Sequence, residues 1–156
     1  MIDVGAASAA LAAQQATWVA RLEPWRSLGY RTDGLERFLR RTGAEKGVLV
    51  ARQGSRGRVV GVLAMQEGVL LGNFVSLLAV RADAAGRGIG RALVAAAEAR
   101  TAEARRWLFV SADAENGAAL AFYRKVGFKR VGRLPDLVRD GRTEILLRKS
   151  VRDGKA

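Results

Sequence analysis

The chain of 156 residues contains no histidine and no cysteine. Without these residues the usual zinc sites cannot form, and Ser-His-Asp and Cys-His catalysis are excluded. Disulfides and a thiol nucleophile are excluded as well. Acid–base chemistry must therefore use carboxylates, tyrosine, lysine, the termini or water. The absence of cysteine also agrees with a cytoplasmic location, which we expect.

Long apolar runs are missing too. No stretch approaches about 18 uninterrupted apolar residues, so we expect no membrane span and no membrane partner. The alanine-rich N-terminus lacks a basic segment, and Gln14 and Gln15 interrupt it. We therefore do not interpret it as a signal peptide.

Acidic residues are few relative to basic ones. The 27 Lys and Arg residues outnumber 15 Asp and Glu residues, which gives a net charge of +12. Such an excess favours polyanions, either nucleic acid or a phosphate-rich cofactor, although a solvated basic surface would look the same. The basic residues are spread over the whole chain, aromatic residues make up only 6%, and no nucleic-acid-binding module is recognisable. Nucleic acid is therefore not expected as the main partner.

The length predicts one domain, residues 1–150, followed by a polar tail at 151–156. Apolar periodicity and turn residues predict alternating α and β segments. In chain order these are a strand at 1–4, helices at 6–22 and from 33, strands at 47–51 and 58–65, a turn at Glu67-Gly68, a strand within 69–80, a helix at 88–104, a strand at 107–111, a helix from the N-cap Asn116 to Gly127, and strands at 128–134 and 143–148.

One stretch in mid-chain carries a binding signal. An apolar run, residues 74–80, is followed by glycines at positions 86, 88 and 90 and then by an alanine-rich helical segment. Glycines before a helix start favour an anion site, most often for phosphate. A Walker A loop would need Lys and Ser or Thr after Gly90, and a Rossmann fingerprint would need glycine in place of Arg91. A glycine-rich turn without a ligand remains the alternative.

Two motifs sharpen this interpretation. The segment Gly86-Arg-Gly-Ile-Gly-Arg-Ala-Leu93 resembles the acyl-CoA loop of the GNAT (GCN5-related N-acetyltransferase) superfamily. The segment Asn116-Gly-Ala-Ala-Leu-Ala-Phe-Tyr-Arg-Lys-Val-Gly-Phe128 is similar to the second motif of that family, and the resemblance runs from about residue 74 to 150. It departs at Ala85, where the family has Arg or Gln. The implied fold is mixed α/β, a mostly antiparallel sheet of about six or seven strands that splays at the cofactor site, with about four flanking helices.

The resemblance also implies roles for residues. The backbone of Leu78, Ala79 and Val80 would pair with the pantetheine arm of acetyl-CoA. The pyrophosphate of acetyl-CoA would bind at the loop residues Gly86, Arg87, Gly88, Ile89, Gly90 and Arg91. In the second motif, Asn116, Ala119 and Tyr123 would also contact acetyl-CoA. Tyr123 is the expected catalytic residue, since its phenol can donate a proton to the departing thiolate. From the helix position alone, Tyr123 would be a half-buried core tyrosine and Asn116 only an N-cap.

A general base is harder to identify. The strand before the loop carries no carboxylate where many members of the family have glutamate. Glu67, Ser76 acting through water, Asp113 and Asp136 all remain open as candidates. Positioning a neutral amine beside the thioester can itself supply much of the rate. Because the chain has no cysteine, we expect direct transfer in a ternary complex.

These observations predict an N-acetyltransferase that moves the acetyl group from acetyl-CoA to a primary amine, without a metal. The acceptor is a small molecule or a peptide N-terminus, because the end of the chain resembles both ribosomal-protein alanine acetyltransferases and small-molecule acetylases. The alternatives are a non-catalytic acyl-CoA-binding module and a basic nucleic-acid-binding protein. A homodimer is common in the family, but no sequence feature tests it.

Overall fold

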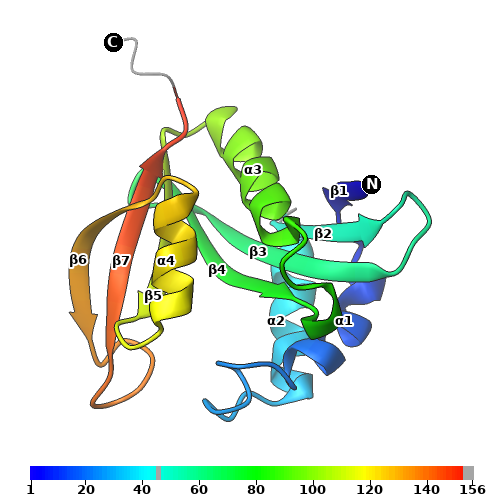
Figure 1. Cartoon of the computed structure of the whole chain (residues 1–156), viewed down its shortest axis with the longest axis horizontal. Coiled ribbons are helices and arrows are strands. Elements are labelled where there is room, and N and C mark those ends of the chain that lie inside the picture. The colour runs from blue at the N-terminus through cyan, green and yellow to red at the C-terminus, as the bar shows by residue number, and fades with distance from the viewer. Residues whose placement is uncertain (45–46, 153–156) are drawn as a thin grey trace. The chain divides into compact units, whose positions relative to one another are not determined.

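The computed structural model describes residues 1–44 and 47–152. These residues form seven strands and four α-helices, which confirms the expected mixed α/β class (Figure 1). The strands are β1 (Ile2–Ala6), β2 (Val48–Gln53), β3 (Val59–Val69), β4 (Gly72–Val80), β5 (Trp107–Asp113), β6 (Lys129–Pro135) and β7 (Thr143–Ser150). The helices are α1 (Ala12–Val19), α2 (Thr32–Ala44), α3 (Ile89–Ala102) and α4 (Gly117–Lys125). None of the helices in the described ranges is long and apolar enough to cross a membrane.

The sheet has the strand order β1-β2-β3-β4-β5-β7-β6. The chain divides into two compact units. The first unit comprises Met1–Gln66 and Leu77–Ala97, and the second comprises Glu67–Ser76 and Glu98–Ala156. Strands β3 and β4 and helix α3 each contribute residues to both units.

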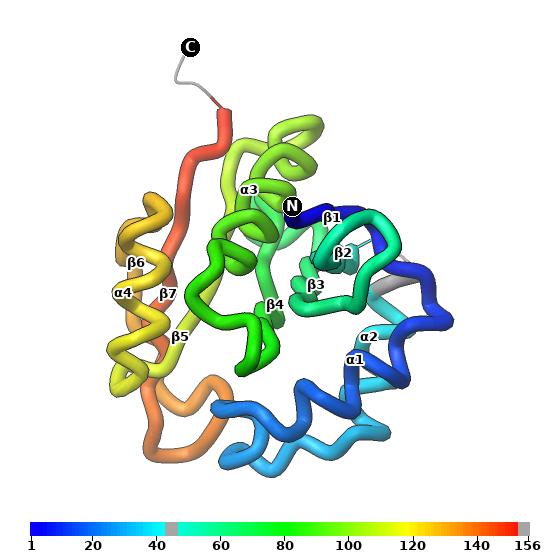
Figure 2. Tube along the Cα trace, turned by 45° about the vertical axis from the view of Figure 1, so that its right-hand side comes forward, coloured from blue at the N-terminus to red at the C-terminus, as the bar shows by residue number. Residues whose placement is uncertain are grey.

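The first unit is built on antiparallel pairing of β1 with β2 and of β2 with β3. Helices α1 and α2 pack side by side against these strands (Figure 2). Helix α2 presents Leu35 and Leu39 to the core, as apolar residues four apart on one helical face should. In α1, the buried Trp18 indole donates a hydrogen bond of 2.7 Å to the Gln15 side chain. This bond explains why a polar residue lies on the apolar face of α1.

Glycine at position 61 controls how closely α3 approaches β3 in this unit. A Cβ atom at Gly61 would lie 2.7 Å from Cγ2 of Ile89 and 2.9 Å from Cδ1 of Leu93. Both distances are shorter than ordinary carbon contacts of about 3.5 to 4.0 Å. The missing side chain therefore creates the space that the first turn of α3 occupies.

In the second unit, β5 lies between two partners. It pairs in parallel with the start of β4 and antiparallel with β7, and β7 pairs with β6 at the edge of the sheet. Helix α4 connects β5 to β6 and packs beside these strands (Figure 1). Lys149 links β7 to α3 and to the end of α4. Its ammonium donates to the Glu98 carboxylate of α3 at 2.5 Å and to the Val126 carbonyl after α4 at 2.8 Å.

Two sequence expectations were wrong. The helix expected over 6–22 is a short 3₁₀ turn at Ala9–Leu11 followed by α1, which is only eight residues long. The turn expected at Glu67-Gly68 lies at Leu70 and Leu71, whose φ angles are +49° and +62°. The nearby Gly72 serves β-sheet packing instead, because a Cβ atom there would lie 2.4 Å from the Trp107 carbonyl oxygen.

Candidate functional site

The residues expected to form the site fall in both units. Leu78 through Arg91 belong to the first unit, and Asn116, Ala119 and Tyr123 belong to the second.

The end of β4 alternates between two environments. Leu77 and Ala79 are buried in the core of the first unit, whereas Leu78 and Val80 are half-buried on the opposite face. In the described residues, the parallel ladder with β5 ends at Val75, although β4 continues for five more residues. The backbone of Leu78 to Val80 therefore lies outside this ladder.

Arg81 fixes the chain where it leaves β4. Its backbone N–H donates to the Val60 carbonyl at 2.8 Å, and its Nε donates to the Val59 carbonyl at 2.9 Å. The guanidinium also lies 4.8 Å from the centre of the Trp18 ring, a cation–π arrangement. Burial lowers the pKa of Arg81, although the guanidinium stays charged. The entrance to the glycine-rich loop is thus anchored to β3 and α1.

The loop itself has the backbone that its glycines predict. Gly86 and Gly88 have φ angles of +76° and +78°, in the left-handed region that side chains disfavour. No described atom lies within 4 Å of a Cβ built at either position, so space is open beside this backbone. Arg87 and the neighbouring Ala85 are exposed. Conformation, not crowding, therefore requires glycine at positions 86 and 88.

Helix α3 begins directly after this loop. The Ala92 N–H donates to the Gly88 carbonyl at 3.0 Å, which makes Gly88 the N-cap. By helix geometry, the N–H groups of Ile89, Gly90 and Arg91 have no acceptor within the helix. The Ile89 side chain is buried and that of Arg91 is exposed. The junction therefore directs free N–H groups, the positive end of the helix and an arginine to one place, as an anion site requires.

In the second unit, Asn116 caps helix α4. Its side-chain oxygen accepts a hydrogen bond of 3.1 Å from the Ala119 N–H. This confirms the predicted N-cap and leaves a further role toward a cofactor untested. At the other end, the Phe128 N–H donates to the Tyr123 carbonyl at 2.9 Å across Gly127, whose φ is +101°. The prediction that Gly127 ends this helix is also confirmed.

Tyr123 is held by its ring. It is 8% exposed and makes edge-on contacts with Phe122 and Phe128, with ring centres 5.2 and 5.6 Å away. Within the described residues, the hydroxyl of Tyr123 forms no hydrogen bond. Every fully buried side-chain oxygen in these residues has a hydrogen-bond partner, so the Tyr123 hydroxyl is not fully buried. Burial raises the pKa of Tyr123, and the charge of Glu144 raises it further. The phenol is therefore protonated at neutral pH, as an ordinary phenol also is, and can donate a hydrogen bond.

The four candidate bases differ in the hydrogen bonds and ion pairs that they already make. Asp113 accepts hydrogen bonds from Arg142 at 2.9 Å and from the Glu115 N–H at 2.8 Å, and these bonds lower its pKa. Asp136 accepts from the Gly141 N–H at 2.7 Å and so holds the β6–β7 turn. Glu67 lies 3.5 Å from an arginine of α3, and Ser76 is half-buried on β4. Each of the three carboxylates thus already has a hydrogen-bond donor or a cation beside it.

Sequence reasoning missed Glu144. This residue lies on β7, opposite Asp113 on β5, and it is half-buried. Burial raises the pKa of its carboxyl, and the charge of Asp113 raises it further, while hydrogen bonding by Ser111 opposes this. The available signal was a glutamate inside an expected strand, where glutamate is disfavoured.

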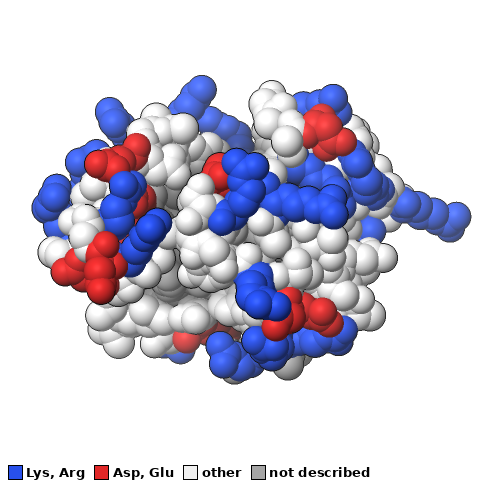
Figure 3. Space-filling model, turned by 90° about the horizontal axis from the view of Figure 1, so that it is seen from below, with Lys and Arg blue, Asp and Glu red and all other residues white. Residues whose placement is uncertain are grey.

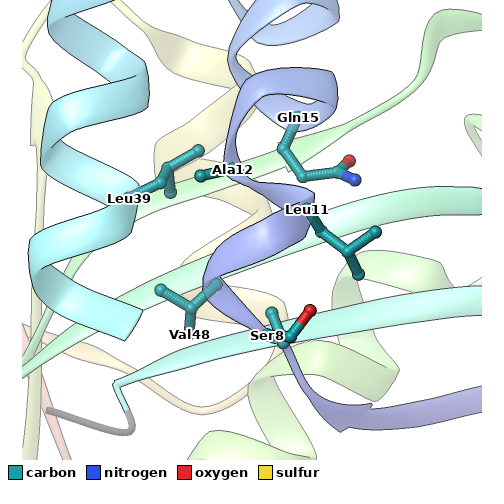
Figure 4. A pocket seen from close by; sticks show the side chains of 7 residues that line it. Ser8, Leu11, Ala12, Gln15, Leu39 and Val48 are labelled. Atoms are coloured by element: carbon teal, nitrogen blue, oxygen red, sulfur yellow. The ribbon is translucent and has the colours of Figure 1, made fainter. Parts of the chain in front are cut away.

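A hollow in the first unit is too small for a cofactor or substrate. Seven residues of the first unit, among them Gln15 and Leu39, line a hollow with a cavity volume of about 10 Å³, which is room for about one water molecule (Figure 4). No group of His, Cys, Asp and Glu in the described ranges could hold a metal. Figure 3 shows one face on which Lys and Arg lie in several separate groups, many beside Asp or Glu.

Comparisons with known proteins agree with this geometry. The family model of the GNAT acetyltransferase domain matches residues 44–130. The comparison with curated proteins found no match. Among solved structures, a GNAT-family acetyltransferase from Bacillus cereus has a TM-score of 0.80 at 18% identity, covering 96% of this chain and 97% of that one.

Two further structures have informative descriptions. Ribosomal-protein-alanine N-acetyltransferase from Brucella melitensis has a TM-score of 0.76 at 23% identity, covering 95% of this chain and 99% of the other. The structure of yncA from Salmonella typhimurium with its cofactor acetyl-CoA has a TM-score of 0.73 at 16% identity, covering 99% of this chain and 96% of the other. Identities this low show the shared fold, while the family model matches more than half of the chain. The protein belongs to the GNAT acetyltransferase family.

Proposed function

We propose that this protein is an acetyl-CoA-dependent N-acetyltransferase of the cytoplasm. It transfers the acetyl group directly to a primary amine of a small molecule or a peptide N-terminus. The observation that carries the proposal is the junction of β4 and α3, where Gly86 and Gly88 have positive φ angles and open space beside their backbone directly before α3 begins. This junction lies inside the segment that matches the family model.

In this proposal, the donor binds along the first unit. Its pyrophosphate accepts hydrogen bonds from the N–H groups of Gly88, Ile89 and Gly90, while Arg87 and Arg91 add positive charge. The pantetheine arm pairs with the backbone of Leu78 and Val80, which lies outside the ladder with β5. Ala85 provides no side-chain contact, so the backbone and the two arginines carry phosphate binding.

Tyr123 is the proposed acid. The departing CoA thiolate has an ordinary thiol pKa of about 8.5, so a protonated phenol can stabilise it or protonate it. The phenol of Tyr123 is protonated at neutral pH, as an ordinary phenol is, and its raised pKa favours stabilising the thiolate by a hydrogen bond over giving up the proton. Asn116 and Ala119 provide the helix start that holds Tyr123 in place.

The similar structures support acetyl-CoA as the donor, and their acceptors are of more than one kind. Their descriptions include bound acetyl-CoA in one case and ribosomal-protein alanine as the acceptor in another. An aminoglycoside 6'-N-acetyltransferase in complex with coenzyme A is also similar, with a TM-score of 0.79. The two acceptors named, ribosomal-protein alanine and an aminoglycoside, are both acetylated on nitrogen, which is why a primary amine is the class proposed here.

The first test is calorimetric titration with acetyl-CoA of the wild type and two glycine variants. Gly88→Ala and Gly54→Ala place the same side chain at nearly the same φ, +78° and +77°, and neither position is crowded. Both substitutions cost about 1 to 2 kcal/mol of backbone strain. Only Gly88 lies in the proposed phosphate site, since Gly54 lies in the turn between β2 and β3.

We expect the wild type and Gly54→Ala to bind acetyl-CoA with equal affinity and Gly88→Ala to bind at least about tenfold more weakly, equivalent to 1.4 kcal/mol. Equal weakening in both variants would show that the loss reflects strain alone. Absence of acetyl-CoA binding by the wild type would contradict the proposed function.

A further inference from the structure

The two ends of the glycine-rich loop rest on the same short stretch of β3. Before the loop, Arg81 donates from its side-chain Nε to the Val59 carbonyl at 2.9 Å and from its backbone N–H to the Val60 carbonyl at 2.8 Å. After the loop, Ile89 packs on Gly61, where an added Cβ atom would lie 2.7 Å from Cγ2 of Ile89. Three consecutive residues of β3 therefore hold both ends of the loop, and all of these residues belong to the first unit.

The pairing of β2 with β3 is irregular at this stretch. In the described register, β2 pairs with Val59 and with Gly61, which leaves Val60 as an extra residue without a partner on β2. An extra residue of this kind interrupts the ladder locally and changes the direction of the groups beside it. The carbonyls of Val59 and Val60 both accept from Arg81, so a single residue after β4 is bonded to both.

An aromatic ring also holds the Arg81 guanidinium. The guanidinium carbon lies 4.8 Å from the centre of the Trp18 ring on α1. The Trp18 indole in turn donates to the Gln15 side chain at 2.7 Å, and both of these residues are buried. A planar guanidinium can stack on a ring and donate to a carbonyl at the same time, which the ammonium of lysine cannot reproduce. Arg81 therefore links α1 to β3 at the point where the chain leaves β4.

A compact turn connects Arg81 to the glycines. Arg81 is the N-cap of a 3₁₀ turn at Ala82–Ala84, and its carbonyl accepts from the Ala84 N–H at 3.0 Å. The Ala84 side chain is buried, so the turn packs into the unit. Gly86 and Gly88, with their positive φ angles, follow directly in the chain. A displacement of Arg81 would therefore move the backbone that leads to the proposed phosphate site.

We propose that Arg81 is the positioning residue of the acetyl-CoA site: it holds the entrance of the glycine-rich loop on β3 and so places the N–H groups at the start of α3 for the pyrophosphate. The inference rests on the proposed function. Arg81 acts through the loop backbone, and this role differs from that of Arg87 and Arg91, which add positive charge beside the phosphates.

Two simpler roles for Arg81 make different predictions. If only its charge mattered, lysine would replace it fully. If it only stabilised the fold, another arginine of the same unit would be an equivalent target. Arg52 of β2 is that control, because it is half-buried like Arg81 and its Nη1 donates to the Gly57 carbonyl at 3.2 Å in the turn between β2 and β3.

The test compares the wild type with Arg81→Lys, Arg81→Met and Arg52→Met. Calorimetry measures the affinity for acetyl-CoA, and urea denaturation measures the stability of each variant. Turnover is then measured with ethanolamine and with a hexapeptide that has an N-terminal alanine, using two donors, acetyl-CoA and S-acetylpantetheine. The second donor carries the same thioester without the pyrophosphate. Since the protein has no cysteine, a thiol reagent detects only the thiol released from the donor.

We expect Arg81→Met to bind acetyl-CoA at least about tenfold more weakly, the scale of losing one hydrogen bond from a charged group. Arg81→Lys should bind at least about threefold more weakly, because the charge remains while the stacked, hydrogen-bonded geometry is lost. Arg52→Met should bind as the wild type does, even where its stability falls. In turnover, the Arg81 variants should raise KM for acetyl-CoA and leave kcat, and kcat/KM for S-acetylpantetheine, within about twofold of the wild type.

Three results would overturn the inference while the wild type still binds acetyl-CoA and the proposed function stands. Wild-type affinity in Arg81→Met would show that the loop keeps its position without the arginine. Wild-type affinity in Arg81→Lys, beside weak binding by Arg81→Met, would show that only charge matters. Equal weakening in Arg52→Met, or an equal loss of kcat/KM with both donors, would show a general loss of stability. Absence of acetyl-CoA binding by the wild type would contradict the proposed function itself, and the inference would fall with it.

Discussion

Substituting Gly61 with alanine tests how the start of α3 is positioned. The added Cβ atom would lie 2.7 Å from Cγ2 of Ile89 and 2.9 Å from Cδ1 of Leu93, and both residues are almost fully buried. A normal contact of about 3.5 Å would require separations larger by about 0.8 and 0.6 Å. Cγ2 of Ile89 sits directly on Cβ and cannot rotate away freely. Helix α3 must therefore shift, or the sheet must bend.

Overpacking of this kind typically costs about 1 to 3 kcal/mol. The control is Gly5→Ala on β1 of the same unit, where the new Cβ atom meets no atom within 4 Å. We expect urea unfolding to show Gly61→Ala destabilised by about 1 to 3 kcal/mol and Gly5→Ala unchanged or slightly stabilised. Acetyl-CoA affinity should fall for Gly61→Ala, because the N–H groups of the first turn move with the helix. Equal stability and wild-type affinity in both variants would refute the packing argument.

Three further predictions concern the second unit. Asn116→Ala should destabilise the protein by about 1 kcal/mol, because the Ala119 N–H loses its cap, and urea denaturation measures this loss. Lys149→Met should cost about 1 to 3 kcal/mol in the same assay, since the half-buried Glu98 carboxylate then loses its partner. Asp113→Asn should flatten the pH dependence of stability in acid. The folded pKa of Asp113 is lowered, so its contribution is fully present above the ordinary carboxyl pKa of about 3.9 and disappears as pH falls through the lower folded value. An unchanged acid profile in that variant would contradict this assignment.

Local sequence signals predicted the elements that local chemistry determines. The apolar run before the glycines became β4, the alanine-rich segment became α3, and Asn116 and Gly127 delimit α4 as their side-chain and backbone preferences require. In the glycine-rich loop, Gly86 and Gly88 have the positive φ angles that glycine favours, and Gly90 lies in the first turn of α3.

Features that depend on pairing between distant segments were not predictable in the same way. Leu70 and Leu71 form the turn between β3 and β4 at φ angles of +49° and +62°, although neither is a residue that favours turns. The role of Gly61 depends on which helix covers β3. Glu144 gains its environment from Ser111 and Asp113 only once β5 and β7 pair. Each of these requires knowledge of contacts between residues far apart in the chain.

The most direct measurement of the central claim is CoA release by the wild type and Tyr123→Phe at saturating acetyl-CoA, over a panel of primary amines and peptides with free N-termini. The account predicts that the wild type releases CoA only when an amine acceptor is present, with a product heavier by one acetyl group. It also predicts that Tyr123→Phe binds acetyl-CoA equally well and turns over more slowly. Acetyl-CoA binding without turnover of any acceptor would contradict the transferase and point to a non-catalytic acyl-CoA-binding module, and absence of acetyl-CoA binding would contradict the account as a whole.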